Sequence, residues 1–463
     1  MKKLDNSKIR NIHFIGINGS SMSGLAEIML GLGYHVSGSD IEQTKKVDYL
    51  RSLGAVIHVP QDEKKVGHPD LIVYTAAINK ENCEYQYGIS NNIEMMNRKD
   101  LLAKLMEQYQ YGIGVSGTHG KTTTTTFVAY LLEKCNFDPT VHIGGEARFL
   151  NSNVKVGNSP YFVTEADEFT DSFLSLHPFI GIILNIEHDH VDYFPTFDDM
   201  KKSFLKYAKL IPDNGYLIIC DDDENTHFIY DQVNCHVIKY GLNNKELDYS
   251  ALDITYNGLG FPSFNLFINR KFRGRVTLGM PGRHNVLNVL SAIAAVHVLG
   301  GNIIDIIEAI KSIEGAKRRL DVRADIRGIK VIADYAHHPT EIDVTLETVS
   351  HMDHHEIYAV FEPHTHSRVR SLYKEFTGCF RYADHVIMAK VYDDREKEDL
   401  INNSENLAKD IAKTGKDTVY LDSYDKIRDH LIRHMKSGDI IMILGSKYVE
   451  GVADQLAEYL NSL

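Results

Sequence analysis

Short apolar runs alternate with helix-like spacing in the N-terminal part of the chain. Residues 12–16 form an apolar run that ends in glycine, as expected of a strand buried in a parallel sheet. Four apolar residues then follow at the spacing of one helix face: Met22, Leu25, Ala26 and Met29. Further strands are predicted at residues 34–40 and 71–74, and an amphipathic stretch at 98–106 closes the segment. This order predicts a doubly wound, Rossmann-like unit.

A second segment opens with a strand at residues 111–115 that runs into a glycine loop and a threonine-rich helix. The stretch 160–192 holds two strands, each followed by acids or histidines, and short apolar runs between Gly and Pro from 247 to 276 indicate a small antiparallel patch. Two phosphate-loop-like openings so far apart in the chain are hard to place in one sheet. We therefore expect two domains up to this point, the second of the phosphate-loop ATPase type.

In a third segment, helix-like spacing such as Ile427, Leu431 and Met435 separates short apolar runs. Four strands are predicted there: residues 330–333, 357–361, 385–389 and 439–444. The pattern again predicts an α/β domain with a mostly parallel, Rossmann-like sheet. The expected fold is thus α/β with three domains: residues 1–107, 108–320 and 321–463.

Composition narrows the class of protein. The 463 residues suit about three domains of roughly 150 residues each, and 43% apolar residues provide material for several cores. With 50 Lys and Arg against 63 Asp and Glu, the formal charge of −13 argues against a general nucleic-acid binder. No apolar run approaches the ~18 residues of a membrane-spanning helix. The N-terminal residues do not resemble a signal peptide.

The five cysteines form no C-x-x-C pair: Cys83, Cys135, Cys220, Cys235 and Cys379. An odd, scattered set fits free thiols in a reducing cytosol better than a disulfide framework. Together with the lack of membrane and export signals, this predicts a cytoplasmic protein with no membrane and no nucleic-acid partner.

The sharpest chemical signal is Gly117-Thr118-His119-Gly120-Lys121-Thr122, followed by Thr123. Backbone N–H groups of such a loop at a helix start point at phosphate oxygens. Lys121 would reach the terminal phosphates of a nucleotide, and the Thr122 hydroxyl would help to hold Mg²⁺. Val115 stands where the strict Walker pattern has glycine, so the loop is a variant. The alternative is an ordinary glycine turn with a surface lysine.

Two strand ends carry candidate metal ligands. Glu165-Ala166-Asp167-Glu168 faces the crevice at the carboxyl ends of the strands, where Glu165 could hold a metal that bridges phosphates. After the next strand, His190 with Asp189 or His188 could serve a second cation, and its imidazole suits Mn²⁺ at least as well as Mg²⁺. For the acidic cluster, the alternative is a set of acids that only stabilises a helix start. For His190 and its neighbours, the alternatives are a solvated loop and a zinc hydrolase, although no residue downstream clearly supplies the third zinc ligand.

The first glycine loop is Gly16-Ile17-Asn18-Gly19-Ser20-Ser21-Met22-Ser23-Gly24, which departs from the G-x-G-x-x-G dinucleotide pattern at Asn18 and Ser21. Its N–H groups can still bind a diphosphate at the helix start. Asp40, at the tip of the second strand, is placed for a ribose hydroxyl. A pyrophosphate group is favoured; a nicotinamide dinucleotide and a plain strand-to-helix turn are the alternatives.

Three further polar clusters adjoin predicted elements. Arg283-His284-Asn285 with Asn288 precedes a helix, so these residues could reach a base or ribose or merely cap the helix. Asp334-Tyr335-Ala336-His337-His338-Pro339-Thr340-Glu341 and His364-Thr365-His366-Ser367-Arg368 both follow strands of the third segment. Arg368 suits a carboxylate or phosphate because its planar fork binds two oxygens. Its alternative role is to pair with a neighbouring Glu and only stabilise the loop.

In this order the motifs resemble the Mur ligase family over nearly the whole chain. The resemblance rests on both glycine loops, Ser37-Gly38-Ser39-Asp40, Glu165-Ala166-Asp167-Glu168, residues 185–190, Gly282-Arg283-His284-Asn285, Lys317-Arg318-Arg319, residues 334–341 and Pro363-His364 with Ser367-Arg368. Within the family, the first loop and residues 334–341 resemble the alanine-adding branch. The chain differs from that branch at Asn18 and Ser21, at Phe169-Thr170, and at Gly445-Ser446-Lys447-Tyr448.

The resemblance implies an ATP-dependent ligase whose three domains bind, in turn, the UDP part of a sugar nucleotide, ATP with Mg²⁺, and an amino acid. ATP would phosphorylate the lactyl carboxylate of UDP-N-acetylmuramate, and the amine of L-alanine would attack the acyl phosphate, in peptidoglycan precursor synthesis. Three alternatives remain: a related ligase that adds a peptide or another amino acid, a nicotinamide-dependent oxidoreductase, and a nucleotide-binding module without catalysis.

The resemblance also implies a role for individual residues. The metal ligands would be Thr122, Glu165 and His190, and the catalytic residues would be Lys121, Glu165, His190 and Arg368. The sugar nucleotide would be bound by Gly16, Asn18, Gly19, Ser20, Ser21, Met22, Ser23 and Asp40. ATP would be bound by Gly117, Thr118, His119, Gly120, Lys121, Thr122, Thr123, His284, Asn285, Asn288, Arg319 and Asp334. The amino acid would be bound by His337, His364 and Arg368.

Overall fold

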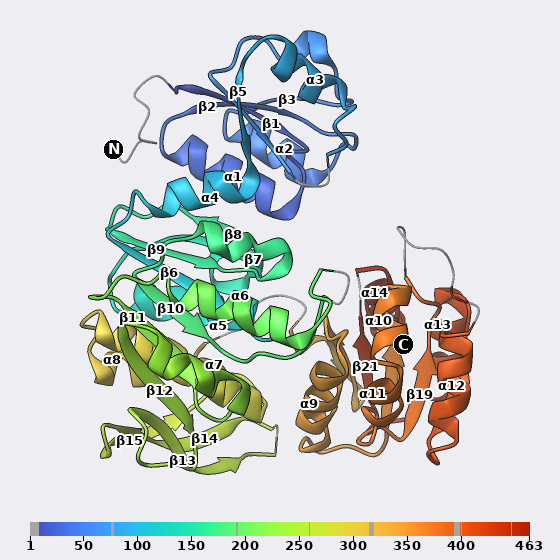
Figure 1. Cartoon of the computed structure of the whole chain (residues 1–463). Coiled ribbons are helices and arrows are strands. Elements are labelled where there is room, and N and C mark those ends of the chain that lie inside the picture. Colours follow the sequence, from blue (N-terminus) through green and yellow to red (C-terminus); the bar gives the residue numbers. More distant parts are fainter. Residues whose placement is uncertain are drawn as a thin grey trace. The chain divides into compact units, whose positions relative to one another are not determined.

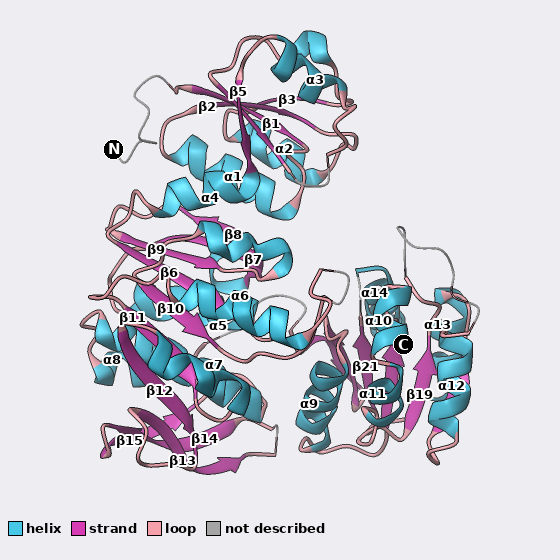
Figure 2. Cartoon of the chain, viewed as in Figure 1, coloured by secondary structure: helices cyan, strands magenta, loops and turns pink. Residues whose placement is uncertain are grey.

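In the part of the chain that the structure describes, the strands form three β-sheets of five, ten and six strands. Helices connect these strands (Figure 1, Figure 2). The structure is a computed structural model that describes residues 9–75, 78–190, 193–258, 260–313, 319–392, 399, 401–445 and 447–463. The motif residues Lys317, Arg318 and Ser446 lie outside the described residues. The mixture of parallel sheets and helices confirms the predicted α/β class.

The first sheet is parallel throughout, in the order β3-β2-β1-β4-β5. Its strands are β1 (Asn11–Ile15), β2 (His35–Ser39), β3 (Val56–His58), β4 (Leu71–Tyr74) and β5 (Glu94–Asn97). Its helices are α1 (Ser20–Gly31), α2 (Lys45–Ser52), α3 (Cys83–Ser90) and α4 (Arg98–Met106). Because β1 lies between β2 and β4, the loop after β1 lies at the switch point where a doubly wound sheet binds ligands. The Rossmann-like prediction is confirmed, although β3 and β5 were not predicted.

The second sheet has the order β15-β14-β13-β12-β11-β10-β6-β9-β7-β8. Its strands are β6 (Tyr111–Ser116), β7 (Thr140–Ala147), β8 (Ser152–Lys155), β9 (Tyr161–Glu165), β10 (Ile180–Ile183), β11 (Tyr216–Cys220), β12 (His236–Leu242), β13 (Tyr249–Tyr256), β14 (Pro262–Ile268) and β15 (Lys271–Thr277). The helices of this part of the chain are α5 (Lys121–Lys134), α6 (Phe197–Ala208), α7 (Arg283–Val298) and α8 (Ile303–Ile310).

Strand β6 pairs in parallel with β9 on one side and β10 on the other. The loops that follow these three strands therefore start at the same edge of the sheet, which brings the phosphate loop, the acidic cluster and residues 185–187 to one place. The predicted antiparallel patch is confirmed as β13, β14 and β15, and it extends the same sheet.

The third sheet has the order β16-β17-β21-β18-β19-β20 and is parallel except for β16. Its strands are β16 (Asp321–Ile326), β17 (Ile329–Asp334), β18 (Ile357–Phe361), β19 (His385–Met388), β20 (Asp417–Tyr420) and β21 (Ile440–Leu444). Its helices are α9 (Pro339–Ser350), α10 (His366–Ser371), α11 (Tyr373–Gly378), α12 (Ser404–Ala412), α13 (Tyr424–His434) and α14 (Lys447–Ser462). Short 3₁₀ helices complete the described chain: η1 (Glu63–Lys65), η2 (Arg148–Leu150), η3 (Phe169–Ser175) and η4 (Glu224–Gln232).

Helices cover both faces of this third sheet. One cluster of buried side chains joins the sheet to α9, α10, α11 and α12, and it includes Leu346 and Phe376. A second cluster joins the opposite face to α13 and α14, and it includes Leu431 and Val452. Because both faces are buried, the central strands read as continuous apolar runs, which is why β17, β18 and β21 were predictable.

By packing, the chain divides into two compact units. The first contains Met1–Glu187, Asp198–Gly241 and Leu290–Ile306, and the second contains His188–Phe197, Leu242–Val289 and Ile307–Leu463. The domain boundaries expected after residues 107 and 320 remain predictions. All five cysteines are free thiols. Among the described residues, no helix combines the length and apolar character needed to cross a membrane.

Candidate active site

The loop between β6 and α5 has the backbone of a phosphate-binding loop. Gly117 and Gly120 have φ angles of +143° and +85°, a region that glycine adopts readily. Asn185 fixes the loop from the neighbouring strand end: its Oδ1 accepts the N–H of His119 at 2.8 Å, and its Nδ2 donates to the His119 carbonyl at 3.1 Å. Its own carbonyl accepts the N–H of Thr118 at 3.1 Å. Asn185 therefore shapes a loop for which sequence reasoning had given it no role.

Lys121 begins α5, and Glu168 holds its ammonium group. The Nζ atom lies 2.9 and 2.8 Å from the two carboxylate oxygens of Glu168, and it donates to the Gly117 carbonyl at 2.7 Å. Burial alone would lower the pKa of Lys121, but the negative charges of Glu168 and Asp167 outweigh it and raise the pKa above its ordinary value. The lysine is therefore a charged group held inside the loop, and the surface-lysine alternative is wrong.

Glu165 ends β9 and contacts both β7 and the phosphate loop. Its Oε1 accepts the N–H of Gly144 at 2.8 Å. Burial raises the pKa of Glu165, while hydrogen bonds from Gly144 and Thr122 oppose that rise. Thr122 and Glu165 thus offer a hydroxyl and a carboxylate side by side, the hard oxygen donors that Mg²⁺ prefers. Thr123, the next residue of the predicted nucleotide set, is buried in the first turn of α5.

The first glycine loop is tied to the second strand. The N–H groups of Gly16 and Ile17 both donate to the Ser39 carbonyl, at 2.9 and 3.0 Å. The N–H of Asn18 donates to Asp40 Oδ2 at 2.8 Å. Asp40 therefore shapes the loop, and its contact with a ribose remains a prediction. Asn18 also uses its side chain, because its Oδ1 accepts the hydroxyl of Thr44 at 2.6 Å.

The end of this loop contacts the second sheet through two serines. Ser20 Oγ donates to the Gly144 carbonyl at 3.3 Å. Ser21 Oγ lies 3.1 Å from His142 Nε2 and accepts a hydrogen bond from Arg98 Nη1 at 2.9 Å. Burial lowers the pKa of His142 to about 4, so its ring is neutral at neutral pH. Sequence reasoning missed His142, Gly144 and the role of Arg98, because nothing local in the sequence connects them with the loop.

The other predicted members of this loop are placed around the start of α1. Gly19 is the N-cap residue of the helix, and because it is a glycine it makes no side-chain hydrogen bond there. Met22 is buried, and the Ser23 hydroxyl donates to the Ser20 carbonyl at 3.0 Å. The helix therefore presents the backbone of Gly19 and Ser20 at its N-terminus, as a diphosphate site requires.

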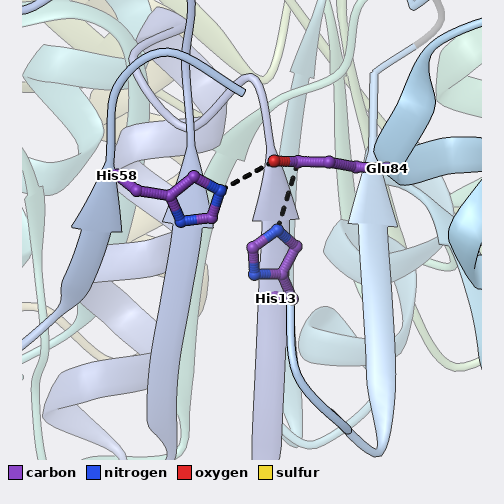
Figure 3. A group of neighbouring side chains, drawn as sticks. All are labelled: His13, His58 and Glu84. Carbon is purple, nitrogen blue, oxygen red and sulfur yellow. Dashed lines mark hydrogen bonds and ion pairs between the residues drawn. The ribbon is translucent and has the colours of Figure 1, made fainter. Parts of the chain in front are cut away.

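A buried carboxylate supports the strand that leads to Asp40 (Figure 3). Glu84 accepts hydrogen bonds from His58 at 2.8 Å, from the N–H of Asp62 at 2.9 Å and from the Ser39 hydroxyl, and His13 Nε2 lies 3.3 Å away. Burial opposes charge on Glu84, but these hydrogen bonds outweigh it and lower its pKa to about 2. Two histidines and a carboxylate resemble a metal site, but both carboxylate oxygens already accept hydrogen bonds, so we interpret the cluster as structural.

In the second compact unit, Arg368 binds a carboxylate of the chain itself. Its Nη2 lies 3.0 and 3.3 Å from the two oxygens of Asp189, and its Nε lies 3.4 Å from Oδ1. The side chains are only 12% and 10% exposed. Burial alone would raise the pKa of Asp189, but the charge of Arg368 outweighs it and holds the pKa well below its usual range. The alternative considered from the sequence was a pair with a neighbouring Glu, whereas the partner is Asp189, which lies 179 positions away in the chain.

Three histidines surround this ion pair. His364 Nδ1 lies 3.4 Å from Arg368 Nη1, and the rings of His337 and His364 are 6.2 Å apart. His190 Nε2 lies 3.9 Å from Asp189 Oδ2. Burial lowers the pKa of His337 to about 4. The three residues expected at the amino acid therefore lie together, whereas a metal role for His190 beside Thr122 and Glu165 remains a prediction.

The asparagines at the start of α7 form a local chain of hydrogen bonds. Asn285 Nδ2 donates to the Pro281 carbonyl at 2.7 Å, and Asn288 Nδ2 donates to Asn285 Oδ1 at 3.1 Å. Burial, followed by the charge of Arg319, lowers the pKa of His284 to about 4. The buried Nδ1 of His284 has no hydrogen-bond partner among the described residues. A neutral ring nitrogen that makes no hydrogen bond within the described chain is compatible with contact to a nucleotide base.

Asp334 is the last residue of β17, and its carboxylate accepts hydrogen bonds from backbone N–H groups before and after this strand. Its Oδ2 accepts the N–H of Leu320 at 2.7 Å, and its Oδ1 accepts the N–H of Ala336 at 2.8 Å. Burial raises the pKa of Asp334, and the charge of Arg319 opposes that rise. The guanidinium of Arg319 also lies over the ring of Tyr335, 5.7 Å from its centroid. Arg319 and Asp334 are thus neighbours at the carboxyl end of the third sheet.

Comparison with known proteins finds family models that match three consecutive segments of the chain. The family model "Mur ligase family, catalytic domain" matches residues 11–110, "Mur ligase middle domain" matches 115–296, and "Mur ligase, glutamate ligase domain" matches 318–447. The UDP-N-acetylmuramate–L-alanine ligase of Caldanaerobacter subterraneus subsp. tengcongensis is 41% identical over 98% of this chain and 99% of its own length. That of Acetivibrio thermocellus is 40% identical over 97% and 96%.

Solved structures are similar over the same length. The UDP-N-acetylmuramate-alanine ligase of Thermotoga maritima superposes with a TM-score of 0.81 at 27% identity, over 98% of this chain and 99% of that one. A murein peptide ligase from Psychrobacter arcticus has a TM-score of 0.70 at 25% identity, over 98% and 99%.

The sheets, the two glycine loops and the acids beside them define an α/β ligase of three domains that carries a phosphate-binding loop. The chain belongs to the Mur ligase family. This membership replaces the oxidoreductase, the zinc hydrolase and the non-catalytic module considered from the sequence.

Proposed function

We propose that the protein joins L-alanine to the lactyl carboxylate of UDP-N-acetylmuramate with consumption of ATP, a step in the synthesis of peptidoglycan precursors. The relatives of 40% and 41% identity bear the name of this reaction. The reaction needs the carboxylate of the sugar nucleotide next to the terminal phosphate of ATP, because a carboxylate is a poor electrophile until one of its oxygens becomes a phosphate leaving group.

One observation supports this proposal above the others. Gly144 accepts the hydroxyl of Ser20 at 3.3 Å through its carbonyl and donates its N–H to Glu165 at 2.8 Å. A single residue of β7 therefore joins the loop proposed for the sugar nucleotide to the carboxylate proposed for the metal. Two substrates held at these loops would meet with their reacting groups close together, which is the main contribution that positioning makes to such a reaction.

Positively charged side chains can offset the electrostatic repulsion between the two anionic substrates. Lys121 is held in its charged form, so it can offset the negative charge that develops on the transferring phosphate. In the second unit, the fork of Arg368 can hold the carboxylate of the amino acid while its amine stays free. His337, which burial keeps neutral at neutral pH, adds no competing positive charge next to that amine.

A divalent cation fits the donors at the phosphate loop. The Thr122 hydroxyl and the Glu165 carboxylate are oxygen ligands and favour Mg²⁺, while the imidazole of His190 would accept Mn²⁺ equally well. A bound cation would neutralise phosphate charge and act as a Lewis acid toward the transferring group. Glu165 is already oriented for this role by its hydrogen bond from Gly144.

The decisive experiment is an amino-acid panel with purified protein, UDP-N-acetylmuramate, ATP and Mg²⁺. We expect ADP release that depends on both the sugar nucleotide and L-alanine, and a product whose mass equals that of UDP-N-acetylmuramate plus one alanine residue. ADP release with a different amino acid, or only with a peptide, would support the related ligases instead. Absence of amino-acid-dependent ADP release would refute the proposal.

A further inference from the structure

The position of Arg368 is fixed by its own backbone. Thr365, the N-cap of α10, has a φ of +64°, a conformation that costs free energy for a non-glycine residue. Its hydroxyl accepts the N–H of Arg368 at 3.4 Å, and the carbonyl of Arg368 accepts the N–H of Leu372 at 3.0 Å. A strained cap followed by a short helix therefore presents the guanidinium at a defined place.

One edge of that guanidinium, formed by Nε and Nη2, is already occupied. Both oxygens of Asp189 contact Nη2, and no other carboxylate of the described chain makes an ion pair with Arg368. The cavity beside the pair has a volume of only about 20 Å³ and is lined by His188, His190 and Ser371, among others. That volume accommodates about one water molecule. The α-carboxylate of an amino acid can therefore bind the edge of the fork formed by Nε and Nη2 only if Asp189 leaves it.

The two partners of this ion pair lie on different kinds of element. Asp189 belongs to the loop that follows β10, whereas Arg368 is held within a helix. An arginine left without any carboxylate in a buried place would be strongly destabilised, whereas an exchange of one carboxylate for another keeps the charge paired throughout. Carboxylate-for-carboxylate exchange is therefore a route by which the site can open at low cost in free energy.

We propose that Asp189 occupies the Arg368 fork in the absence of an amino acid and is displaced by the α-carboxylate of the amino-acid substrate. This inference rests on the proposed function. Asp189 is a positioning residue in this scheme: it keeps Arg368 extended toward the site and competes with the substrate for it. The competition lowers the apparent affinity for the amino acid, because the apparent Kd equals the intrinsic Kd divided by the fraction of molecules in which the fork is open.

The test compares Asp189→Asn and Asp189→Ala with the wild type. We expect the KM for L-alanine to fall by about tenfold in both variants, because the internal competitor is gone, while the KM for ATP stays the same. Asp343→Asn is the matched control, since Asp343 also pairs with an arginine of the same unit, Arg381, at 2.6 Å; its KM for L-alanine should not change. An unchanged or raised KM for L-alanine in both Asp189 variants would overturn the proposal.

A second measurement does not depend on turnover. Phenylglyoxal modifies accessible arginines, and mass spectrometry identifies the modified residue. Arg368 should react faster in Asp189→Asn than in the wild type, and propionate, a bare carboxylate, should protect it in the variant at lower concentration. Equal reactivity in the two proteins would overturn the exchange. If no amino acid supports turnover, the proposed function fails, and this measurement alone decides whether Asp189 yields to an external carboxylate.

Discussion

The ammonium nitrogen of Lys121 lies 2.8 Å from a carboxylate oxygen of Glu168, whose side chain has no exposed surface. The pair keeps the lysine charged and directed along the phosphate loop before any nucleotide binds. Removing the cation that is paired with a buried carboxylate is costly in free energy. The catalytic and the structural consequences of removing Lys121 therefore have to be separated.

Lys121→Ala should reduce turnover by about two to three orders of magnitude, as expected when one electrostatic contact to a transition state is removed. It should also lower the free energy of unfolding by about 3–5 kcal/mol, because Glu168 stays buried after it has lost this cation. The double variant Lys121→Ala/Glu168→Gln should recover much of that stability but none of the activity. Steady-state kinetics and urea unfolding measure the two effects. Recovery of activity in the double variant would show that Lys121 acts only through the fold.

Gly144→Ala should weaken metal-dependent turnover. A Cβ atom at this position would lie 2.7 Å from Glu165 Oε2, so the carboxylate would have to turn away from Thr122. We expect the concentration of Mg²⁺ needed for half-maximal activity to rise several-fold, with a smaller change in the KM for L-alanine. Gly378→Ala is the control, because a Cβ atom there meets nothing within 4 Å. An unchanged Mg²⁺ requirement would argue against Glu165 as a metal ligand.

Gly19→Val should raise the KM for UDP-N-acetylmuramate and leave the KM for ATP unchanged. The backbone at Gly19 has a negative φ of −56°, and a Cβ atom would meet nothing closer than 3.5 Å. Gly19→Ala should therefore fold and act nearly as the wild type does. The two branched methyl groups of valine, in contrast, would extend into the space where a diphosphate must approach the backbone. A rise in the KM for ATP instead would mean that the two loops serve the opposite nucleotides.

Arg368→Lys should cut activity sharply, and Arg368→Ala more so, with ATP binding preserved. A lysine keeps the charge that pairs with Asp189 but lacks the planar fork that binds two oxygens of a carboxylate. Isothermal titration with ATP and kinetics with increasing L-alanine separate the two steps. If Arg368→Ala retained its KM for L-alanine and its turnover, Arg368 would lie outside the substrate site.

Glu84→Gln should destabilise the protein at neutral pH by about 3 kcal/mol, the scale expected when a buried, hydrogen-bonded charge is removed. The folded pKa of Glu84 is about 2, below its ordinary value of 4.5. Its stabilising contribution is therefore fully present above pH 4.5 and is lost as the pH falls toward about 2. The difference in unfolding free energy between wild type and variant should shrink across that window. Glu81→Gln, at an exposed position, is the control and should show no such convergence.

The sequence determined the features that depend on neighbouring residues. The phosphate loop was predictable because glycines with positive φ at 117 and 120, and a lysine at a helix start, are a local requirement for phosphate binding. Strands such as Leu71–Tyr74 and Ile357–Phe361 were predictable because both of their faces are buried. Strands β3 and β5 were missed because Val56–His58 and Glu94–Asn97 are short and partly exposed, so they carry no clear apolar pattern.

Only the tertiary structure decided which side chains meet. The pairing of Arg368 with Asp189 joins residues 179 positions apart, and the contact of Ser21 with His142 joins residues 121 positions apart. Gly144 gave no signal of its own, because its role depends on the approach of β7 to Glu165. Local patterns specify backbone conformation and burial, whereas the partner of a charged side chain depends on strand order and on where distant loops end. That is why the sequence pointed to Lys121 and Arg368 as candidate residues but did not predict that the carboxylates of Glu168 and Asp189 would pair with them.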